Sequence, residues 1–82
     1  MRIINQDKTC DIPYEKSVLN IQKVNENSFN VNGYFSDRYF WLGSYEDMNH
    51  AKAVLWDIAS NFIEGKKYYE MPQAYEDLTC MQ

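Results

Sequence analysis

The longest periodic stretch of apolar residues runs from residue 45 to residue 64. Apolar side chains recur there every three or four positions, which is the spacing of one helical face. They are Met48, Ala51, Val54, Leu55, Ile58 and Phe62. Ser44 stands three residues before Asp47, as in a capping box, and Glu46 adds negative charge near the positive end of the helix dipole. Gly65 and the two lysines after it suit the other end, so the pattern predicts a helix over residues 45–64.

A second, thinner stripe runs along the same predicted helix. It consists of Lys52, Trp56, Ala59 and Ile63. Either the core-facing stripe is unusually wide, or the helix covers its own sheet and also contacts a second copy of the chain. A chain of 82 residues buries a small fraction of its surface and gains from association. We therefore predict a subunit contact at Trp56, Ala59 and Ile63, in a homodimer or a higher homo-oligomer.

Short β-rich segments separated by turn residues precede the helix. They cover residues 2–4, 9–12, 17–24, 28–31 and 38–43. Residues 17–24 alternate, with Leu19 and Ile21 on one face, and Phe29 and Val31 share an apolar face after a polar turn, so this pair predicts a hairpin. Two further turns are expected from favourable residue pairs. They lie at Asn32–Gly33 and Ser36–Asp37.

One more short strand, over residues 67–71, follows the helix and ends at Pro72. Several strands followed by a single helix predict an α+β fold. We expect an antiparallel meander of short strands covered by one long helix, with a short C-terminal strand. Residues 1–72 form this single domain, and residues 73–82 are an acidic, frayed C-terminal tail.

Charge and cysteine content limit the possible partners. The formal net charge is −4, and the only arginines are Arg2 and Arg38, which argues against a protein that binds duplex nucleic acid. No apolar run approaches the length of a membrane span, and the first residues do not resemble a signal peptide. Cys10 and Cys80 are expected to be reduced, so we predict a soluble protein of the cytoplasm that does not contact membranes.

Candidate catalytic residues are few. His50 is the only histidine and falls in the first turn of the predicted helix, where we expect it to be solvated. Nothing in the sequence pairs it with a cysteine, and the clustered ligands of a metal site are absent. The three glycines are explained as turns and caps rather than as a phosphate loop. We predict no enzymatic activity and no cofactor.

What remains is binding, and aromatic residues, at 16% of the chain, exceed what a minimal core needs. In residues 38–43, Phe40 and Leu42 alternate toward the core, while Tyr39 and Trp41 point outward. These outward residues are either ordinary packing aromatics or the rim of a pocket for a small ligand. Guanidinium, ammonium and flat aromatic groups would hold phosphates and bases. The predicted ligand-binding residues are Arg38, Trp41, Asn61, Lys66, Lys67 and Tyr69.

Three stretches carry a resemblance to a known group of proteins. They are the opening MRIINQDKTCDIPYE, the centre LGSYEDMNHAKAVLWDIASNFI and the closing YYEMP. Together they resemble small proteins from phages and prophages of Gram-positive bacteria. The matching N-terminal positions are expected to be structural: Arg2, Ile3, Ile4, Asp7, Asp11, Ile12, Pro13, Tyr14 and Glu15. Lys8 stands where many of these proteins have glycine, so a different type of first turn is expected.

Some of these phage proteins resemble the sponge-type Thoeris anti-defence proteins, which bind cyclic nucleotide signals of bacterial immunity without cleaving them and assemble as oligomers. The resemblance implies a non-enzymatic phage protein that sequesters a cyclic nucleotide in the cytoplasm of the infected bacterium. Two other roles stay open. One is inhibition of a host or defence protein by direct binding, and the other is a structural, accessory function in the phage.

Overall fold

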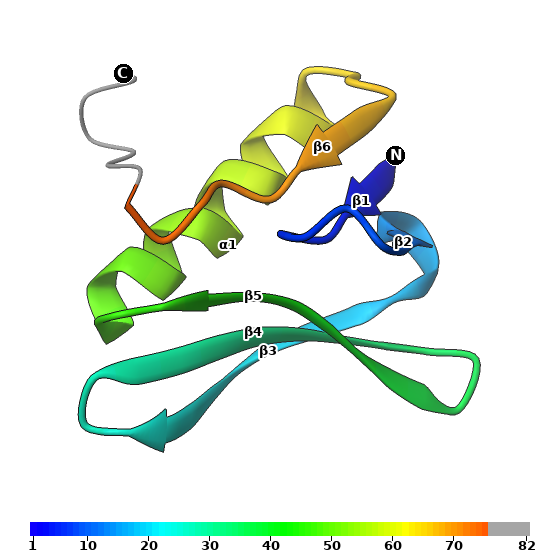
Figure 1. The fold of residues 1–82 in the computed structure, drawn as a ribbon. Helices are drawn as coiled ribbons and strands as arrows, with labels where there is room; N and C mark the ends of the chain where they lie inside the picture. The colour runs from blue at the N-terminus through cyan, green and yellow to red at the C-terminus, as the bar shows by residue number, and fades with distance from the viewer. Residues whose placement is uncertain (76–82) are drawn as a thin grey trace.

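Two small sheets and one helix make up the fold (Figure 1). The structure is a computed structural model that describes residues 1–75. Its elements, in chain order, are β1 (Arg2–Ile4), β2 (Asp11–Pro13), the 3-10 helix η1 (Tyr14–Lys16), β3 (Val18–Asn25), β4 (Ser28–Phe35), β5 (Arg38–Tyr45), α1 (Met48–Ile63) and β6 (Tyr68–Glu70). The predicted α+β class is confirmed.

The three-stranded antiparallel sheet has the order β3-β4-β5 and contains the predicted hairpin. The turn between β4 and β5 lies at Ser36 and Asp37, which have φ angles of 55° and 62°. The turn predicted at Asn32–Gly33 is wrong, because both residues lie inside β4. Gly33 is needed there for a different reason. A Cβ at this position would lie 2.3 Å from the side chain of Ile12, so the glycine lets β2 approach the sheet.

Helix α1 begins three residues later than predicted. Its N-cap is Asp47, whose Oδ1 accepts a hydrogen bond from the backbone N–H of His50 at 2.7 Å. Ser44 is not part of the cap, since it belongs to β5 and its hydroxyl donates to Asn30 Oδ1 at 2.6 Å. The C-terminal end is as predicted: Gly65 has a φ of 83°, a conformation that glycine adopts without strain.

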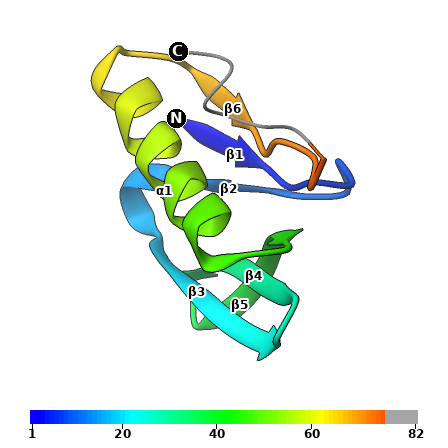
Figure 2. The same cartoon turned by 90° about the vertical axis from the view of Figure 1, so that its left-hand side faces the viewer.

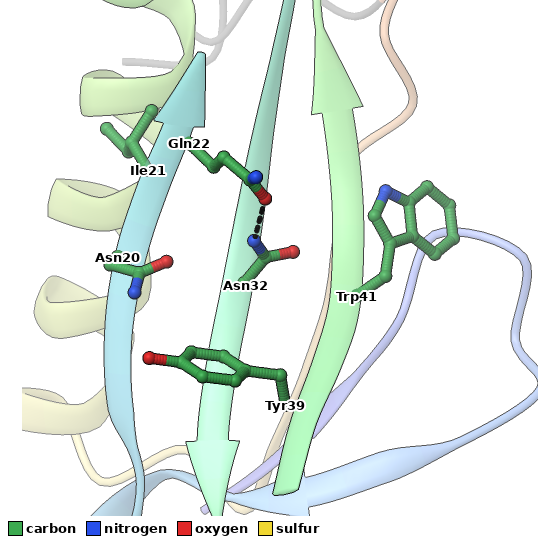
Figure 3. Close-up of a pocket in the computed structure, with 6 residues that line it drawn as sticks. All are labelled: Asn20, Ile21, Gln22, Asn32, Tyr39 and Trp41. Carbon is green, nitrogen blue, oxygen red and sulfur yellow. Dashed lines mark hydrogen bonds between the residues drawn. The ribbon is translucent and has the colours of Figure 1, made fainter. Parts of the chain in front are cut away.

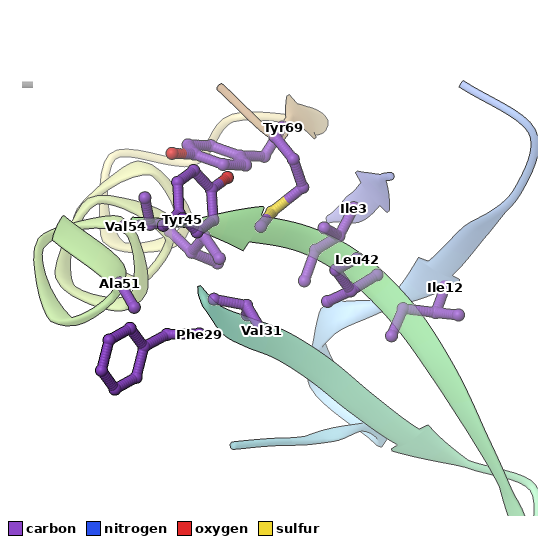
Figure 4. Packing of buried hydrophobic residues seen from close by; sticks show 11 residues of the cluster. Ile3, Ile12, Phe29, Val31, Leu42, Tyr45, Ala51, Val54 and Tyr69 are labelled. Carbon is purple, nitrogen blue, oxygen red and sulfur yellow. The ribbon is translucent and has the colours of Figure 1, made fainter. Parts of the chain in front are cut away.

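The core lies between α1 and the two sheets (Figure 4). Ala51, Val54 and Ile58 of the predicted helical stripe are fully buried. Leu55 is half-buried, and Phe62 at the end of the stripe packs its ring 4.9 Å from that of Tyr14. The other buried apolar residues are Ile3, Ile12, Phe29, Val31, Leu42, Tyr45, Tyr69 and Met71.

The second sheet departs from the single meander that we predicted. Its order is β2-β1-β6, and β1 pairs with β6 in parallel, with Ile3 opposite Tyr69 (Figure 2). β1 and β6 therefore lie side by side next to α1, on the same side of the larger sheet as the helix. The second sheet satisfies the backbone groups of β1, which the longer sheet does not reach.

The connection between β1 and β2 is organised by a buried side chain. Asn5 Oδ1 accepts hydrogen bonds from the backbone N–H groups of Thr9, at 2.8 Å, and Cys10, at 3.2 Å. Lys8 has a φ of 61°, so lysine adopts the left-handed conformation that glycine prefers. Lys8 thus fits a backbone conformation that glycine could also adopt at this position. A different type of turn between β1 and β2, which we predicted from Lys8, is therefore not required.

The start of the predicted C-terminal tail contacts the domain. Gln73 Nε2 donates a hydrogen bond to the backbone carbonyl of Gln6 at 2.8 Å. Residues 76–82 of the predicted tail, and with them Cys80, lie outside the described residues. Within residues 1–75, no helix has the length and apolarity that a membrane crossing requires.

Candidate functional site

The face of the β3-β4-β5 sheet turned away from α1 carries the candidate site. Leu42 is fully buried in the core and Phe40 is half-buried against it, while Tyr39 and Trp41 point outward and are exposed. The alternation predicted for this strand is therefore confirmed. Tyr39 lies opposite Tyr34 in the neighbouring strand, with ring centroids 4.8 Å apart.

An open depression of about 640 Å³ crosses this face (Figure 3). Its lining residues are Asn20, Ile21, Gln22, Asn32, Tyr39 and Trp41. Asn32 Nδ2 donates a hydrogen bond to Gln22 Oε1 at 3.0 Å, which links β4 to β3 across the floor. The indole of Trp41 donates through Nε1 to Ser44 Oγ at 2.9 Å, so the ring is held in one orientation.

This arrangement suits a flat ligand with hydrogen-bonding edges. The faces of Tyr39 and Trp41 can stack on planar rings, and stacking of this kind tolerates any base. Three side-chain amides lie nearby, on Asn20, Gln22 and Asn32, and each amide offers both donors and an acceptor. None of the lining side chains is charged. The depression therefore matches a nucleobase better than a phosphate group.

Arg38 does not join this face. Its guanidinium lies over the ring of Phe40, with Cζ 5.6 Å from the ring centroid. Phe40 packs toward the core, so Arg38 is on the opposite side of β5 from Tyr39 and Trp41. Strand alternation explains the separation, since residues two apart share a face and neighbours do not.

The predicted binding residues after the helix form a separate group beside the second sheet. Lys66 and Lys67 are exposed in the connection to β6. Asn61 already donates through Nδ2 to the backbone carbonyl of Asp57 at 2.8 Å. Tyr69 is only 7% exposed, and its hydroxyl donates to Asp57 Oδ2 at 2.6 Å. The predicted stacking role of Tyr69 is wrong for this geometry, because its ring is part of the core.

The predicted subunit contact is on the outer side of α1. Trp56 is 75% exposed and Ile63 is 83% exposed, whereas Ala59 is half-buried. Large apolar side chains at this exposure are often covered by a partner. The contact itself stays a prediction.

Two candidate reactive side chains, Cys10 and His50, are not among the residues that line the depression. Cys10 is a half-buried free thiol, and its pKa is raised, mainly by burial and also by the nearby charges of Asp7 and Asp11. A raised pKa lowers the thiolate fraction and so the nucleophilicity. His50 is not solvated as we predicted. Its ring lies 4.7 Å from that of Tyr45, and its Nε2 is buried without a hydrogen-bond partner.

Metal coordination is not supported either. The described residues contain no group of three or more His, Cys, Asp or Glu side chains that could hold a metal ion.

Asn20, Gln22 and Asn32 were not among the predicted site residues. A signal for two of them was present, because the alternation in residues 17–24 places Asn20 and Gln22 on the face away from Leu19 and Ile21. Asn32 was missed because the pair Asn32–Gly33 has the composition of a tight turn.

No family model, no curated protein and no solved structure matches the chain. The relationship expected from the three quoted stretches therefore stays a prediction.

Proposed function

We propose that the protein is a non-enzymatic binding protein that sequesters a small cyclic nucleotide. The base of the ligand stacks on Trp41 and Tyr39, and the amides of Asn20, Gln22 and Asn32 hydrogen-bond its edge. The observation that carries the proposal is the depression on the outer sheet face, which is lined by two aromatic side chains, Tyr39 and Trp41, and by the three amides. Its volume of about 640 Å³ is within the range of small-molecule sites.

The charge distribution supports a small ligand rather than a nucleic acid chain. A net charge of −4 opposes a polymer of phosphates. One or a few phosphates can be tolerated where the depression opens to solvent, because physiological salt screens charges beyond about 8 Å. In this arrangement the base supplies the affinity and the phosphates stay hydrated at the rim.

Binding without turnover is supported by the state of the reactive groups. The Cys10 thiol has a raised pKa, and the buried Nε2 of His50 lies on the other side of the sheet, beside Tyr45 in the core. Neither group is among the residues that line the depression. A ligand held over Trp41 would therefore have no nucleophile or general base next to it.

The biological setting in this proposal comes from the sequence resemblance. In this setting the chain is a phage protein that acts in the cytoplasm of the infected bacterium, where it removes a cyclic nucleotide signal of immunity. Sequestration requires the signal to stay bound and intact, which a stacking site without catalytic groups provides.

Tryptophan fluorescence tests the proposal directly, since the chain has two tryptophans. Trp56→Phe leaves Trp41 as the sole reporter, and Trp56 lies on α1 outside the depression. We expect micromolar quenching by at least one cyclic dinucleotide, cyclic trinucleotide or cyclic ADP-ribose isomer. Trp41→Ala should weaken binding about 5- to 150-fold in equilibrium dialysis, which corresponds to about 1–3 kcal/mol for one stacked base.

Trp56→Ala is the matched control and should bind as the unsubstituted protein does. The ligand recovered after heating should have its original mass, since no turnover is expected. If none of these nucleotides binds at micromolar concentration, or if Trp41→Ala binds unchanged, the proposal fails.

A second candidate function uses the same aromatic face. Tyr39 and Trp41 are large and exposed, and aromatic side chains are enriched where proteins bind proteins. The protein would then inhibit a host or defence protein by direct contact. Co-purification of one host protein that Trp41→Ala fails to retain, together with no nucleotide in the heat-released fraction, would favour this function.

A further inference from the structure

Strand β3 is an uncovered edge of the larger sheet. The other edge strand, β5, is covered by the loop after β1. The backbone N–H of Gln6 donates to the Leu42 carbonyl at 2.7 Å, and Gln6 Oε1 accepts from the Ser44 N–H at 3.1 Å. No segment within residues 1–75 makes comparable hydrogen bonds to the outer side of β3. A strand of eight residues thus presents unpaired backbone groups, the usual template for pairing with another strand.

The sequence of β3 is self-complementary in one antiparallel register. When Ile21 faces its own copy, Asn20 lies opposite Gln22 of the partner subunit, and Val18 lies opposite the partner's Val24. Val18 is 66% exposed and Val24 is 54% exposed, so side-chain contact at the two ends of this register would cover apolar surface. Paired residues share a face of the sheet, so the register keeps both depressions on one side and both helices on the other.

We propose that two copies of the chain pair through β3 in this register and form one continuous six-stranded sheet. The flank of α1 favours the same arrangement. Asp57 accepts a hydrogen bond from Tyr69 of the second sheet, so the Asp57 side of α1 faces that sheet. Leu55 and Phe62 lie on the other side of the helix axis from Asp57. They therefore lie on the β3 side, where α1 passes behind that strand (Figure 3), and they are only partly covered. A second helix across the two-fold axis would cover them.

The charge at this edge permits self-association of an acidic chain. Lys23 is the only charged residue in β3, and its Nζ lies 3.3 Å from Glu26 Oε1. No carboxylate of β3 would face a carboxylate of the partner strand. The register of β3 against β4 shifts between Lys23 and Asn25, so the regular pairing covers residues 19–23, and the contacts of Val18 with the partner's Val24 lie just beyond its two ends.

The area at this edge matches a modest interface. The whole edge of β3, including the ends beyond the regular pairing, has eight residues and extends about 27 Å, and a strand with a helix behind it is about 20 Å thick. The projected area is therefore roughly 500 Å², close to the lower end of about 600 Å² per partner in specific interfaces. We expect a dissociation constant in the micromolar range, with backbone hydrogen bonds setting the register.

The pairing also changes the candidate site. Each depression reaches β3 through Asn20 and Gln22, so the two depressions would meet across the two-fold axis. This consequence rests on the proposed function, whereas the pairing itself requires no ligand. A ligand lying across the two-fold axis would contact Asn20 and Gln22 of both copies, whereas the two Trp41 side chains, five strand spacings or about 24 Å apart, would belong to separate sites.

A charge reversal within β3 tests the register in the absence of nucleotide. Asn20→Lys with Gln22→Lys places lysines opposite each other across the two-fold axis, and Asn20→Glu with Gln22→Lys places glutamate opposite lysine. Both sites are exposed, and circular dichroism with thermal melting would establish that each variant folds. Light scattering and sedimentation at 5–100 µM would report the mass. The unsubstituted chain of 9.8 kDa should give about 20 kDa at the upper end.

We expect the double-lysine variant to be monomeric at these concentrations. The glutamate–lysine variant should dimerise, with a dissociation constant at least tenfold lower than that of the double-lysine variant. A monomer at 100 µM for the unsubstituted chain would overturn the proposal. It would also be overturned if the double-lysine variant dimerised undiminished, or if both variants were equally monomeric. Dimerisation lost in Trp56→Glu but kept in the double-lysine variant would assign the contact to the outer side of α1 instead.

Discussion

At the scale of single residues, polar side chains stabilise the connection between β1 and β2 through hydrogen bonds. The pattern of hydrophobic positions in the sequence does not predict these bonds. Asn5 is buried, yet both ends of its amide are paired, with Nδ2 donating to Thr9 Oγ1 at 3.1 Å. Asp7 Oδ1 accepts from the Thr9 hydroxyl at 2.6 Å. A buried amide that is fully paired stabilises one conformation and penalises alternatives in which it is unpaired. These bonds hold Lys8 in its left-handed conformation.

An ion pair between β1 and β2 predicts how stability depends on pH. Asp11 accepts a hydrogen bond from Arg2 Nε at 2.9 Å, and this bond is the main reason that the pKa of Asp11 is lowered. The pKa of Glu15 is also lowered, mainly by its hydrogen bond with the N-terminal ammonium group. A carboxyl group whose pKa is lower in the folded state contributes stability above its unfolded pKa and loses it as pH falls through the folded pKa.

We therefore expect the melting temperature to be nearly constant from about pH 6 to pH 5 and to fall below about pH 4, where carboxyl groups of unfolded chains protonate. Asp11→Asn should flatten this decline, because it removes one of the two carboxyl groups in residues 1–75 whose pKa is lowered. Glu46→Gln, which removes the same formal charge elsewhere, serves as the control. Parallel curves for the unsubstituted protein and Asp11→Asn would contradict the assignment.

At the scale of elements, periodicity predicts the buried face of α1 but not where the helix starts. Ala51, Val54 and Ile58 are buried as predicted, since their spacing reflects the helix geometry directly. Ser44 and Asp47 are both acceptable caps, and the choice depends on pairing in the preceding strand. Because Ser44 bonds to Asn30 in β4, β5 continues to Tyr45 and the cap moves to Asp47.

Substitutions along α1 should separate its buried face from its flank. Ile58→Ala should lower the free energy of unfolding by about 2–5 kcal/mol, because Ile58 is fully buried and its removal leaves a cavity. Leu55→Ala should cost less, since Leu55 is only half-buried. Urea denaturation would measure both values, with Trp56→Ala as an exposed control. A smaller loss for Ile58→Ala than for Leu55→Ala would show that the helix is rotated relative to this structure.

The candidate site was predictable only in part at this scale. Alternation in β5 places Trp41 on the outer face, and the structure agrees. The other predicted residues lie apart from it because binding was inferred from residue type, whereas a site requires residues from different strands to meet. The register that brings Asn20 and Asn32 opposite each other is fixed by the β3–β4 turn and its bulge, which a single strand pattern does not encode.

At the scale of the whole molecule, the division into two sheets was the feature that the sequence did not predict. β1, β2 and β6 each have three residues, too few for alternation to define a face. The parallel pairing of β1 with β6 depends on the path of α1, which returns the chain to the first strand. The fold class can be predicted from the order of strands and helix along the chain. Which sheet a strand joins depends on contacts between segments that are distant in the sequence.

One hydrogen bond joins the second sheet to the helix and gives a prediction at this scale. Tyr69→Phe removes the donor to Asp57 Oδ2, and hydrogen bonds to charged groups contribute about 1.5–3 kcal/mol. We expect a loss of this size in the free energy of unfolding, with the largest increase in amide hydrogen exchange in β6 and β1. Tyr68→Phe is the matched control, because Tyr68 is exposed in the same strand. Equal effects of the two variants would show that the bond does not hold the sheets together.

The parallel pairing of β1 with β6 also has a consequence for how the protein is made. The hairpin β3-β4-β5 connects neighbours in sequence, so it can form as soon as these residues leave the ribosome. β1 has to wait for β6, and at about 5–20 residues per second the delay is roughly 3 to 13 seconds. Until β6 has emerged, the apolar side chains of Ile3 and Ile12 lack part of their core, so the nascent chain stays open to aggregation and proteolysis during that interval.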